Sequence, residues 1–354
     1  MRARIIAALL LALTGFGGVA VPARAAPTTV CPSGCLYTGI QAAVDAAASG
    51  TTIRIKSGTY AERVTIAKDL TLTGAGADGT TIDGGGGDVV TVAFGVTVRI
   101  SGLTITGGGS GIRNDGGTVT VTNSRIVGNA SGGIFHQGTL TLKNSVVSGN
   151  STDQSGGGIY NNESTVTLKN SRITGNSAPS GGGIYSAEGH VTLDNSRVED
   201  NWATFDGGGI AGTEVVLTLN RSTVSGNGAG RNGGGLDNYA GTAGEIPVTL
   251  NESTVADNTA ANDGGGIHND AGIVRLDSSA VTGNRAGGDG GGIFNTGFNY
   301  YAPSAGVLSL EQSRVTGNVA GSGGGIFNVE PNPVTLETSR VRRNTPDDCV
   351  GMEC

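Results

Sequence analysis

Asp237, His268 and Asp270 are the residues of this sequence best suited to acid–base chemistry. Asp237 and His268 each follow a run of three glycines and one apolar residue, and Asp270 lies two residues beyond His268. A histidine that shares a site with carboxylates can pass a proton to or from a saccharide, as in a polysaccharide lyase or a glycoside hydrolase. The same side chains could bind a sugar without reaction, or could be ordinary solvated surface. They are therefore candidate catalytic residues beside two non-catalytic alternatives.

Aromatic residues occupy the same position in other copies of this glycine motif. In chain order the position is Phe135, Tyr160, Tyr185, Ala211, Asp237, His268, Phe294 and Phe327. The preceding apolar residue is expected to face inward, so this position is expected to face outward. Phe135, Tyr160 and Tyr185 could bind sugar rings, or they could form a self-stacked ladder that stiffens a sheet.

Two copies of the repeat are longer than the others, and both carry their extra residues at the same point. The additions run from Tyr239 to Ile246 and from Thr296 to Gly306, on either side of the shorter copy that holds His268. We therefore predict two loops that wall a groove with Asp237 and His268 on its floor. The aromatic residues of these walls are further candidates for glycan binding: Tyr239, Phe298, Tyr300 and Tyr301.

Three aspartates that precede glycine runs suggest a weaker metal hypothesis. Asp206, Asp263 and Asp289 could hold Ca²⁺ through their oxygens if successive copies stack. Serine fills the same position in other copies, and the glycine–aspartate nonapeptide of RTX proteins is absent, so a solvated acidic turn is the alternative. We predict no cofactor, with Ca²⁺ as the one open possibility.

The elements that must position these residues come from a repeat of roughly 25 residues. A serine lies five residues before each anchoring asparagine, Val or Ile lies three before it, and Val and Leu alternate with polar residues upstream. Alternation with period two predicts strands with one buried face, and so short a coil can bury that face only by stacking on its neighbours. We predict an all-β, single-stranded, right-handed parallel β-helix of about a dozen coils, with asparagine and serine ladders inside its turns. The anchors are Asn129, Asn150, Asn176, Asn201, Asn227, Asn258, Asn284, Asn318 and Asn344.

The two ends of this solenoid are predicted to be closed. The segment 38–41 has the spacing of a helix capping box, and an amphipathic helix with Ile40 and Val44 on its buried face, ended by Gly50, would cover the first coil. The stack holds the two cysteine pairs some 50 Å apart, so only the local disulfides Cys31–Cys35 and Cys349–Cys354 are open to it.

The first residues are typical of an export signal. Arg2 and Arg4 precede a short apolar run, and small residues near Ala25 offer a cleavage site. We expect a signal peptide at 1–25, a cap with disulfide and helix at 26–50, the β-helix at 51–345 and a disulfide tail at 346–354. Removing the signal leaves 19 basic against 29 acidic side chains, which argues against nucleic acid and anionic membranes as partners. We expect a secreted, extracellular monomer without a membrane span.

The sequence also resembles known β-helix families. Residues 37–83, with Gly58-Thr59-Tyr60 and Leu70-Thr71-Leu72, look like the first coils of pectinesterase-type and copper-periplasmic-type β-helices. Residues 100–345 resemble secreted bacterial right-handed β-helix repeat proteins of the pectin lyase-like superfamily, and their GN-x-A and GGGI motifs are similar to repeats of polymorphic outer membrane proteins. The resemblance implies the fold. The catalytic patterns of pectinesterases and polygalacturonases are missing, and Arg54-Ile55-Lys56 and Asp347-Asp348 occur without their companion motifs.

Three functions remain open at this point. The first is a non-catalytic extracellular structural, adhesive or glycan-binding module, whose partner is an extracellular polysaccharide or a cell-surface glycan. The second is a polysaccharide lyase or hydrolase that uses Asp237 and His268. The third is an ice-binding protein, suggested by an outward threonine column that includes Thr120, Thr141, Thr167, Thr192, Thr218 and Thr249.

Overall fold

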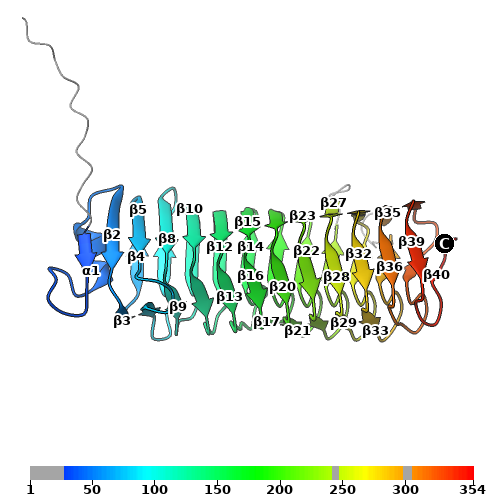
Figure 1. Ribbon diagram of the computed structural model, residues 1–354, viewed down its shortest axis with the longest axis horizontal. Helices are drawn as coiled ribbons and strands as arrows, with labels where there is room; N and C mark the ends of the chain where they lie inside the picture. Colours follow the sequence, from blue (N-terminus) through cyan, green and yellow to red (C-terminus); the bar gives the residue numbers. More distant parts are fainter. Residues whose placement is uncertain (1–27, 241–246, 298–304) are drawn as a thin grey trace, which may run out of the picture.

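The protein is one long stack of β-strand coils (Figure 1). The computed structural model describes residues 28–240, 247–297 and 305–354. In this part of the chain the strands of neighbouring coils pair in parallel, and the only helix lies at the N-terminal end of the stack. The predicted right-handed parallel β-helix is confirmed.

Each complete coil contributes to two long columns that lie in one 23-stranded sheet. The first column consists of β1 (Thr28–Val30), β2 (Thr51–Ile55), β5 (Leu70–Thr73), β8 (Thr97–Ser101), β10 (Ile112–Thr122), β12 (Ile134–Lys143), β15 (Thr165–Lys169), β19 (His190–Asp194), β23 (Val216–Asn220), β27 (Pro247–Asn251), β31 (Ile273–Asp277), β35 (Val307–Glu311) and β38 (Val334–Glu337). The other, which we call the glycine-motif column, consists of β4 (Val64–Ile66), β7 (Val90–Val92), the first parts of β10 and β12, β14 (Ile159–Asn162), β18 (Ile184–Ala187), β22 (Ile210–Thr213), β26 (Leu236–Tyr239), β30 (Ile267–Asp270), β34 (Ile293–Thr296), β37 (Ile326–Asn328) and β40 (Cys349–Val350). The two columns count as one sheet because β10 and β12 run through both.

Two further columns complete the coil. One of them is a 12-stranded sheet of β3 (Gly58–Ala61), β6 (Thr80–Asp83), β9 (Thr104–Thr106), β11 (Arg125–Val127), β13 (Val146–Ser148), β16 (Arg172–Thr174), β20 (Arg197–Glu199), β24 (Thr223–Ser225), β28 (Thr254–Ala256), β32 (Ala280–Thr282), β36 (Arg314–Thr316) and β39 (Arg340–Arg342). The short column has five strands of two residues: β17 (Ser177–Ala178), β21 (Trp202–Ala203), β25 (Gly228–Ala229), β29 (Thr259–Ala260) and β33 (Arg285–Ala286).

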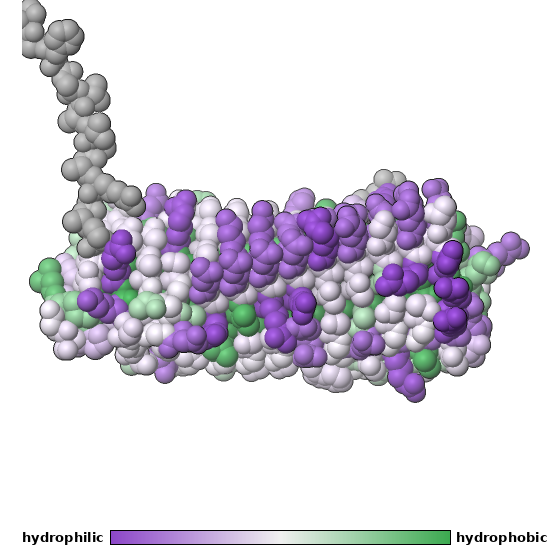
Figure 2. Space-filling model, viewed as in Figure 1, coloured by the Kyte–Doolittle hydropathy of each residue, from purple (hydrophilic) through white to green (hydrophobic). Residues whose placement is uncertain are grey.

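The core is a continuous stack of Val, Ile and Leu from the inward positions of the two long columns and the 12-stranded sheet, and the short column adds buried alanines. In one coil Ile159, Val166, Leu168 and Ile173 are all fully buried, and their counterparts in the neighbouring coils are buried as well. Most outward positions of the first column are polar, and Figure 2 shows hydrophilic side chains in a band along the upper part of the face in view. Burial of one strand face by stacking is thus the main source of stability.

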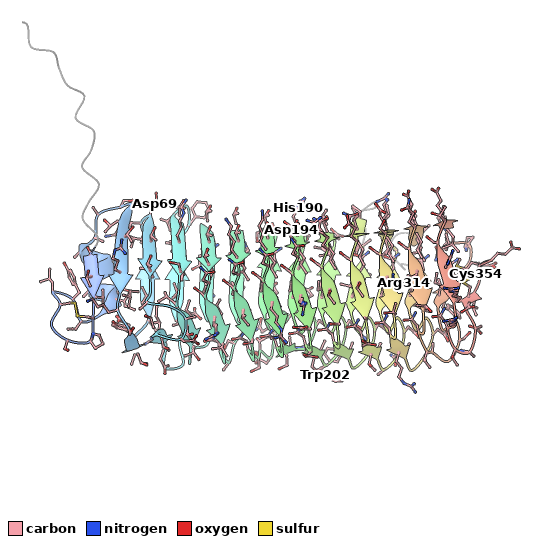
Figure 3. The ribbon with its side chains drawn as sticks, in the orientation of Figure 1. Asp69, His190, Asp194, Trp202, Arg314 and Cys354 are labelled. Atoms are coloured by element: carbon pink, nitrogen blue, oxygen red, sulfur yellow. A yellow bond between two sulfur atoms is a disulfide. The ribbon has the colours of Figure 1, made fainter. Side chains whose placement is uncertain are left out.

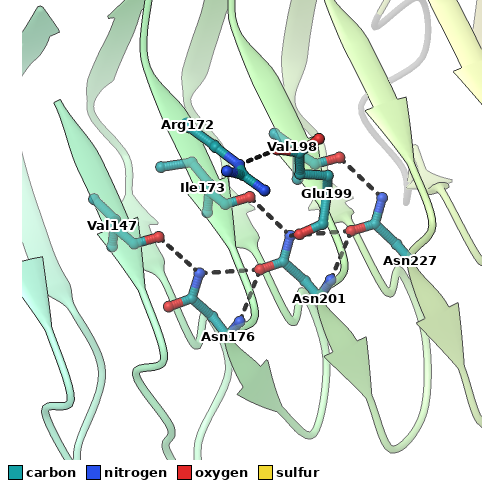
Figure 4. Close-up of polar contacts among 8 residues, drawn as sticks. All are labelled: Val147, Arg172, Ile173, Asn176, Val198, Glu199, Asn201 and Asn227. Atoms are coloured by element: carbon teal, nitrogen blue, oxygen red, sulfur yellow. Dashed lines mark hydrogen bonds and ion pairs between the residues drawn. The ribbon is translucent and has the colours of Figure 1, made fainter. Parts of the chain in front are cut away.

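The anchoring asparagines form the predicted ladder (Figure 4). Asn201 shows the pattern: its backbone N–H and its Nδ2 both donate to Oδ1 of Asn227, each at 3.0 Å. Nδ2 of Asn201 also donates to the carbonyl of Ile173 at 3.1 Å. The serines stack in the same way, with the backbone N–H of Ser196 donating to Oγ of Ser222 at 3.0 Å. Both predicted ladders are confirmed.

A third inward ladder was not predicted. It lies in the glycine-motif column and includes Asn238, whose Nδ2 donates to Oδ1 of Asn269 at 2.8 Å. In the same register His136 replaces asparagine and is fully buried. Its Nδ1 accepts from Nδ2 of Asn114 at 3.0 Å, so its Nε2 donates to the carbonyl of Thr165 at 3.2 Å. Burial lowers the pKa of His136 to about 4, although its contacts with backbone carbonyls oppose the shift.

The N-terminal helix α1 (Ile40–Ala46) covers the first coil as predicted, with Ile40 and Val44 buried. The predicted capping box is wrong, because the N-cap is Gly39 and it makes no side-chain hydrogen bond to the helix. The carboxylate of Glu62 instead accepts the N–H groups of Ile40 at 2.6 Å and Gln41 at 2.9 Å. The helix also ends at Ala46, before Gly50.

The cysteines form the two local pairs predicted, one at each end of the stack. The Cα atoms are 5.7 Å apart in Cys31–Cys35 and 6.2 Å apart in Cys349–Cys354. Among the described residues there is no helix with the length and apolar character needed to span a bilayer.

Candidate functional site

The outward residues of the glycine-motif column lie in register, as the repeat predicts. Phe135 pairs with Tyr160, Tyr160 with Tyr185, and Tyr185 with Ala211. The rings of Phe135 and Tyr160 stack at 5.4 Å, and those of Tyr160 and Tyr185 at 5.5 Å, with interplanar angles of 4° and 13°. The three rings therefore form a ladder in which each covers a face of the next, and Arg113 lies over Phe135 at 4.8 Å from the ring centroid.

The aromatic ladder stops at Ala211 and resumes two coils later at His268. The imidazole of His268 stacks on Phe294 at 5.3 Å, and Phe294 stacks on Phe327 at 5.4 Å. Asp237 lies between Ala211 and His268 in the register. The histidine is therefore held on one side by a phenyl ring and on the other by a carboxylate.

Asp237 and His268 form a hydrogen-bonded pair. Oδ1 of Asp237 lies 2.8 Å from Nδ1 of His268, and only 7% of His268 is exposed. Burial on its own would lower the pKa of His268, but the hydrogen bond and the charge of Asp237 outweigh it and raise that pKa. A carboxylate that orients an imidazole and favours its protonated form is an arrangement that can support general acid catalysis.

Asp270 is the third member of this cluster. It follows His268 on the outward face of β30, where it lies opposite Tyr239. Its Oδ1 is buried and has no hydrogen-bond partner. Burial raises the pKa of Asp270, with the charge of Asp237 adding to the shift and that of His268 opposing it. The fold thus brings together the three acid–base candidates of the sequence.

Most of the predicted groove walls lie outside the described residues. These are residues 241–246 and 298–304, which include Phe298, Tyr300 and Tyr301. Tyr239 is described and ends strand β26 beside the cluster. The groove itself therefore stays a prediction.

A hollow of about 300 Å³ lies beside the other end of the aromatic column, and we call it the Phe135 hollow. Its lining includes Arg113, Ser131, Phe135, Thr152, Gln154 and Tyr160. An open hollow with an aromatic side and several hydrogen-bonding groups matches the needs of a sugar residue.

Two of the three aspartates of the metal hypothesis accept backbone N–H groups of the next coil. Oδ1 of Asp263 accepts the N–H of Asp289 at 2.7 Å, and Oδ1 of Asp206 accepts the N–H of Asn232 at 3.1 Å. Asp206 also forms an ion pair with Arg231. Across the described part of the chain, no three His, Cys, Asp or Glu side chains converge as a metal site. The calcium hypothesis stays untested.

The threonine column of the ice-binding hypothesis is in register from Thr120 to Thr249. A second rank runs beside it from Thr97 through Thr118 and Thr139 to Thr165, where His190 replaces threonine. The two threonine ranks lie side by side over only part of their length. The flat surface that ice binding would use is therefore short.

Sequence reasoning missed one exposed aromatic pair. Trp202 in β21 is 52% exposed and Phe205 is 49% exposed. Figure 3 shows Trp202 at the lower edge of the molecule, away from the strand columns in front. The aligned aromatic column follows the glycines, whereas Trp202 lies before them in β21 and Phe205 lies between β21 and the glycines. The signal that could have found them is that Trp202 is the sole tryptophan of the sequence.

Comparison with known proteins agrees with the geometry. Residues 88–253 match the family model described as the right handed beta helix region. The chain has the right-handed parallel β-helix fold. No curated protein has a significantly similar sequence.

Among the solved structures similar to this chain are parts of two carbohydrate-active enzymes. The catalytic unit of a GH87 α-1,3-glucanase from Streptomyces thermodiastaticus is 18% identical with a TM-score of 0.50, over 87% of this chain and 66% of the glucanase. The A-module of a mannuronan C-5 epimerase from Azotobacter vinelandii is 15% identical with a TM-score of 0.47, over 89% of this chain and 95% of the module. At these identities the likeness shows the fold alone.

Proposed function

We propose that this protein is a secreted, non-catalytic module that binds an extracellular polysaccharide. The site is the Phe135 hollow together with the ladder of Phe135, Tyr160 and Tyr185. The observation that carries the proposal is the position of this hollow against rings held in register on a rigid sheet. Aromatic edges, a guanidinium and an amide around an open hollow suit a sugar residue of a polymer that continues beyond it.

Two further points support the proposal. Both cysteine pairs are disulfides, which fits an oxidising extracellular setting. The α-1,3-glucanase of similar fold acts on a polysaccharide.

A glycan array with the purified mature protein tests the proposal. We expect binding to at least one polysaccharide, and we expect Tyr160→Ala to weaken that binding about tenfold or more. Phe327→Ala is the matched control, because its ring also belongs to this column and stacks on Phe294 at the far end. A site at the Phe135 hollow would be contradicted if both variants lost binding equally, or if neither variant lost any.

The second candidate function is acid–base catalysis at Asp237 and His268. It is favoured by the 2.8 Å contact between the two side chains and by the neighbouring carboxyl group of Asp270. In this reading protonated His268 would donate a proton to a saccharide and Asp237 would hold the imidazole in place. Any polysaccharide bound on the array is incubated with the protein and assayed for reducing ends and unsaturated products. Product that disappears in His268→Gln would establish the enzyme and exclude the non-catalytic proposal.

A further inference from the structure

Trp202 and Phe205 form the exposed aromatic patch that neither candidate site uses. Large aromatic side chains are seldom left half exposed, and clusters of them on a surface mark binding sites. The two residues lie on the coil between Asn201 and Ala211, and the patch faces out at the short column.

The neighbours of Trp202 in the short column are small. Trp202 pairs with Ser177 on one side and Gly228 on the other. A Cβ on Gly228 would lie 2.6 Å from Cε3 and 2.7 Å from Cζ3 of Trp202, so the six-membered ring of the indole covers this glycine. Gly228 therefore provides the space in which the indole rests on the next coil.

This setting differs from that of the aromatic ladder. Tyr160 has a stacked ring on each side, whereas Trp202 has backbone beneath it and no aromatic ring in register on either side. The ladder rings present mainly their edges, while Trp202 leaves half of its surface open. An open indole face is the surface on which the C–H face of a pyranose can stack.

A fixed guanidinium completes the patch. Arg231, from the next coil, lies over Phe205 at 5.6 Å from the ring centroid. Its Nε donates to Oδ1 of Asp206 at 2.8 Å, and its Nη2 contacts Oδ2 of the same carboxylate. This fork occupies two of the five N–H groups of the guanidinium and holds it in place, so the other three can meet a ligand. Arg231 remains 54% exposed in this arrangement.

The charges around the patch favour an uncharged ligand. Asp206 compensates Arg231, and the mature chain as a whole has more acidic than basic side chains. A polyuronate would meet a guanidinium already paired with Asp206, on a chain with an excess of acidic side chains.

We propose that Trp202, Phe205 and Arg231 bind a pyranose of an uncharged polysaccharide. The sugar stacks on the indole, and its hydroxyl groups accept hydrogen bonds from Arg231. This inference rests on the proposed glycan-binding function and adds a second contact site with a stated ligand class.

The fluorescence of the single tryptophan tests the inference directly. Wild-type protein is titrated with soluble neutral glucans, mannans and xylans, and with polygalacturonate. We expect one neutral polymer to shift the emission to shorter wavelength in a saturable way and to reduce acrylamide quenching about twofold. In affinity electrophoresis, Trp202→Ala should bind this polymer at least tenfold more weakly, and Trp202→Phe should retain part of the affinity. Phe94→Ala is the matched control, since Phe94 is 84% exposed and its ring covers Gly116 on a distant coil.

The outcomes separate this inference from the function on which it rests. Suppose that a neutral polymer binds Trp202→Ala with normal affinity and leaves the tryptophan emission of the wild-type protein unchanged. This result overturns the inference and leaves glycan binding intact. Protection of Trp202 by polygalacturonate alone overturns the uncharged ligand class. Failure of every polymer to bind the wild-type protein overturns both proposals.

Discussion

Asp348 ends the asparagine ladder by accepting both hydrogen bonds that Asn344 donates along it. The backbone N–H and Nδ2 of Asn344 each lie 2.9 Å from Oδ1 of Asp348. In every earlier coil the acceptor of this pair of bonds is the next asparagine, as Asn344 itself is for Asn318. Asp347-Asp348, an isolated pair in the sequence, thus has a structural role at the C-terminal end.

Asp348→Ala should loosen the last coils. It leaves two buried donors of Asn344 without an acceptor, at a cost of about 1–3 kcal/mol. Because a solenoid opens locally, native-state amide exchange in the coil of Asn344 should quicken by roughly tenfold or more, while the coil of Asn176 stays unchanged. Asp348→Asn keeps Oδ1 and should behave nearly as the wild type. Equal exchange in wild type and Asp348→Ala would refute the ladder cap.

His136 should make the N-terminal coils sensitive to acid. Its pKa is about 4 in the folded protein and 6.5 in the unfolded chain, so the unfolded state binds the proton more tightly. The contribution of neutral His136 to the free energy of unfolding is therefore complete above pH 6.5. It falls by about 3 kcal/mol as the pH drops to 4.

His136→Asn removes the titrating group and restores the residue type of its neighbours Asn114 and Asn161. Amide exchange of these coils, measured from pH 7 to pH 4, should then lose most of its acid dependence. An unchanged profile in the variant would show that other groups cause it.

The Asp237–His268 pair should be visible by NMR. The chain has three histidines, so each imidazole can be assigned and titrated. His268 should titrate above 6.5 in the wild type because Asp237 raises its pKa. In Asp237→Asn the charge is lost, burial dominates, and the pKa of His268 should fall below its wild-type value. His190, on another column, serves as the internal control, and a common shift of both would count against the pair.

Glu62 should stabilise α1 from a distance. Glu62→Ala leaves the N–H groups of Ile40 and Gln41 without their acceptor, and a lost helix cap typically costs about 1 kcal/mol. Glu62→Gln retains one acceptor oxygen and should lie between the variant and the wild type. Circular dichroism is too weak for so short a helix, so amide exchange at Val44 is the measurement, and no change there would contradict the cap.

The regular part of the fold could be predicted because the same residue types recur in the same surroundings in each coil. Asn201 and Asn227 face identical surroundings, so one recurring residue type in sequence implies one ladder in space. The cap of α1 could not be predicted, since Glu62 is 22 residues from Ile40 and competes with a local motif that has the right spacing. Local spacing shows which bonds can form, and tertiary contacts decide which ones do.

The candidate site was predicted in part for a similar reason. Register alone places Asp237 beside His268, so their contact followed from the repeat. Trp202 directly follows the anchor Asn201 and begins β21, at a position whose residue type differs between coils. The anchors Asn201 and Asn227 place it opposite Gly228, but the contact of the indole with that glycine, and its exposed fraction, depend on the side-chain conformation.

The register on either side of the two long repeats has a consequence for how this chain can change. β26 pairs with β30 residue for residue, and β27 pairs with β31 in the same manner, although their connecting segments differ in length. Additions at this corner therefore leave the stack undisturbed, whereas one extra residue inside a strand would turn its apolar side chains to water. The chain can therefore gain or lose whole coils, or vary in length at this corner of each coil, while the other coils keep their structure. Mutation can thus reshape one edge of the solenoid freely while the ladders hold its interior constant.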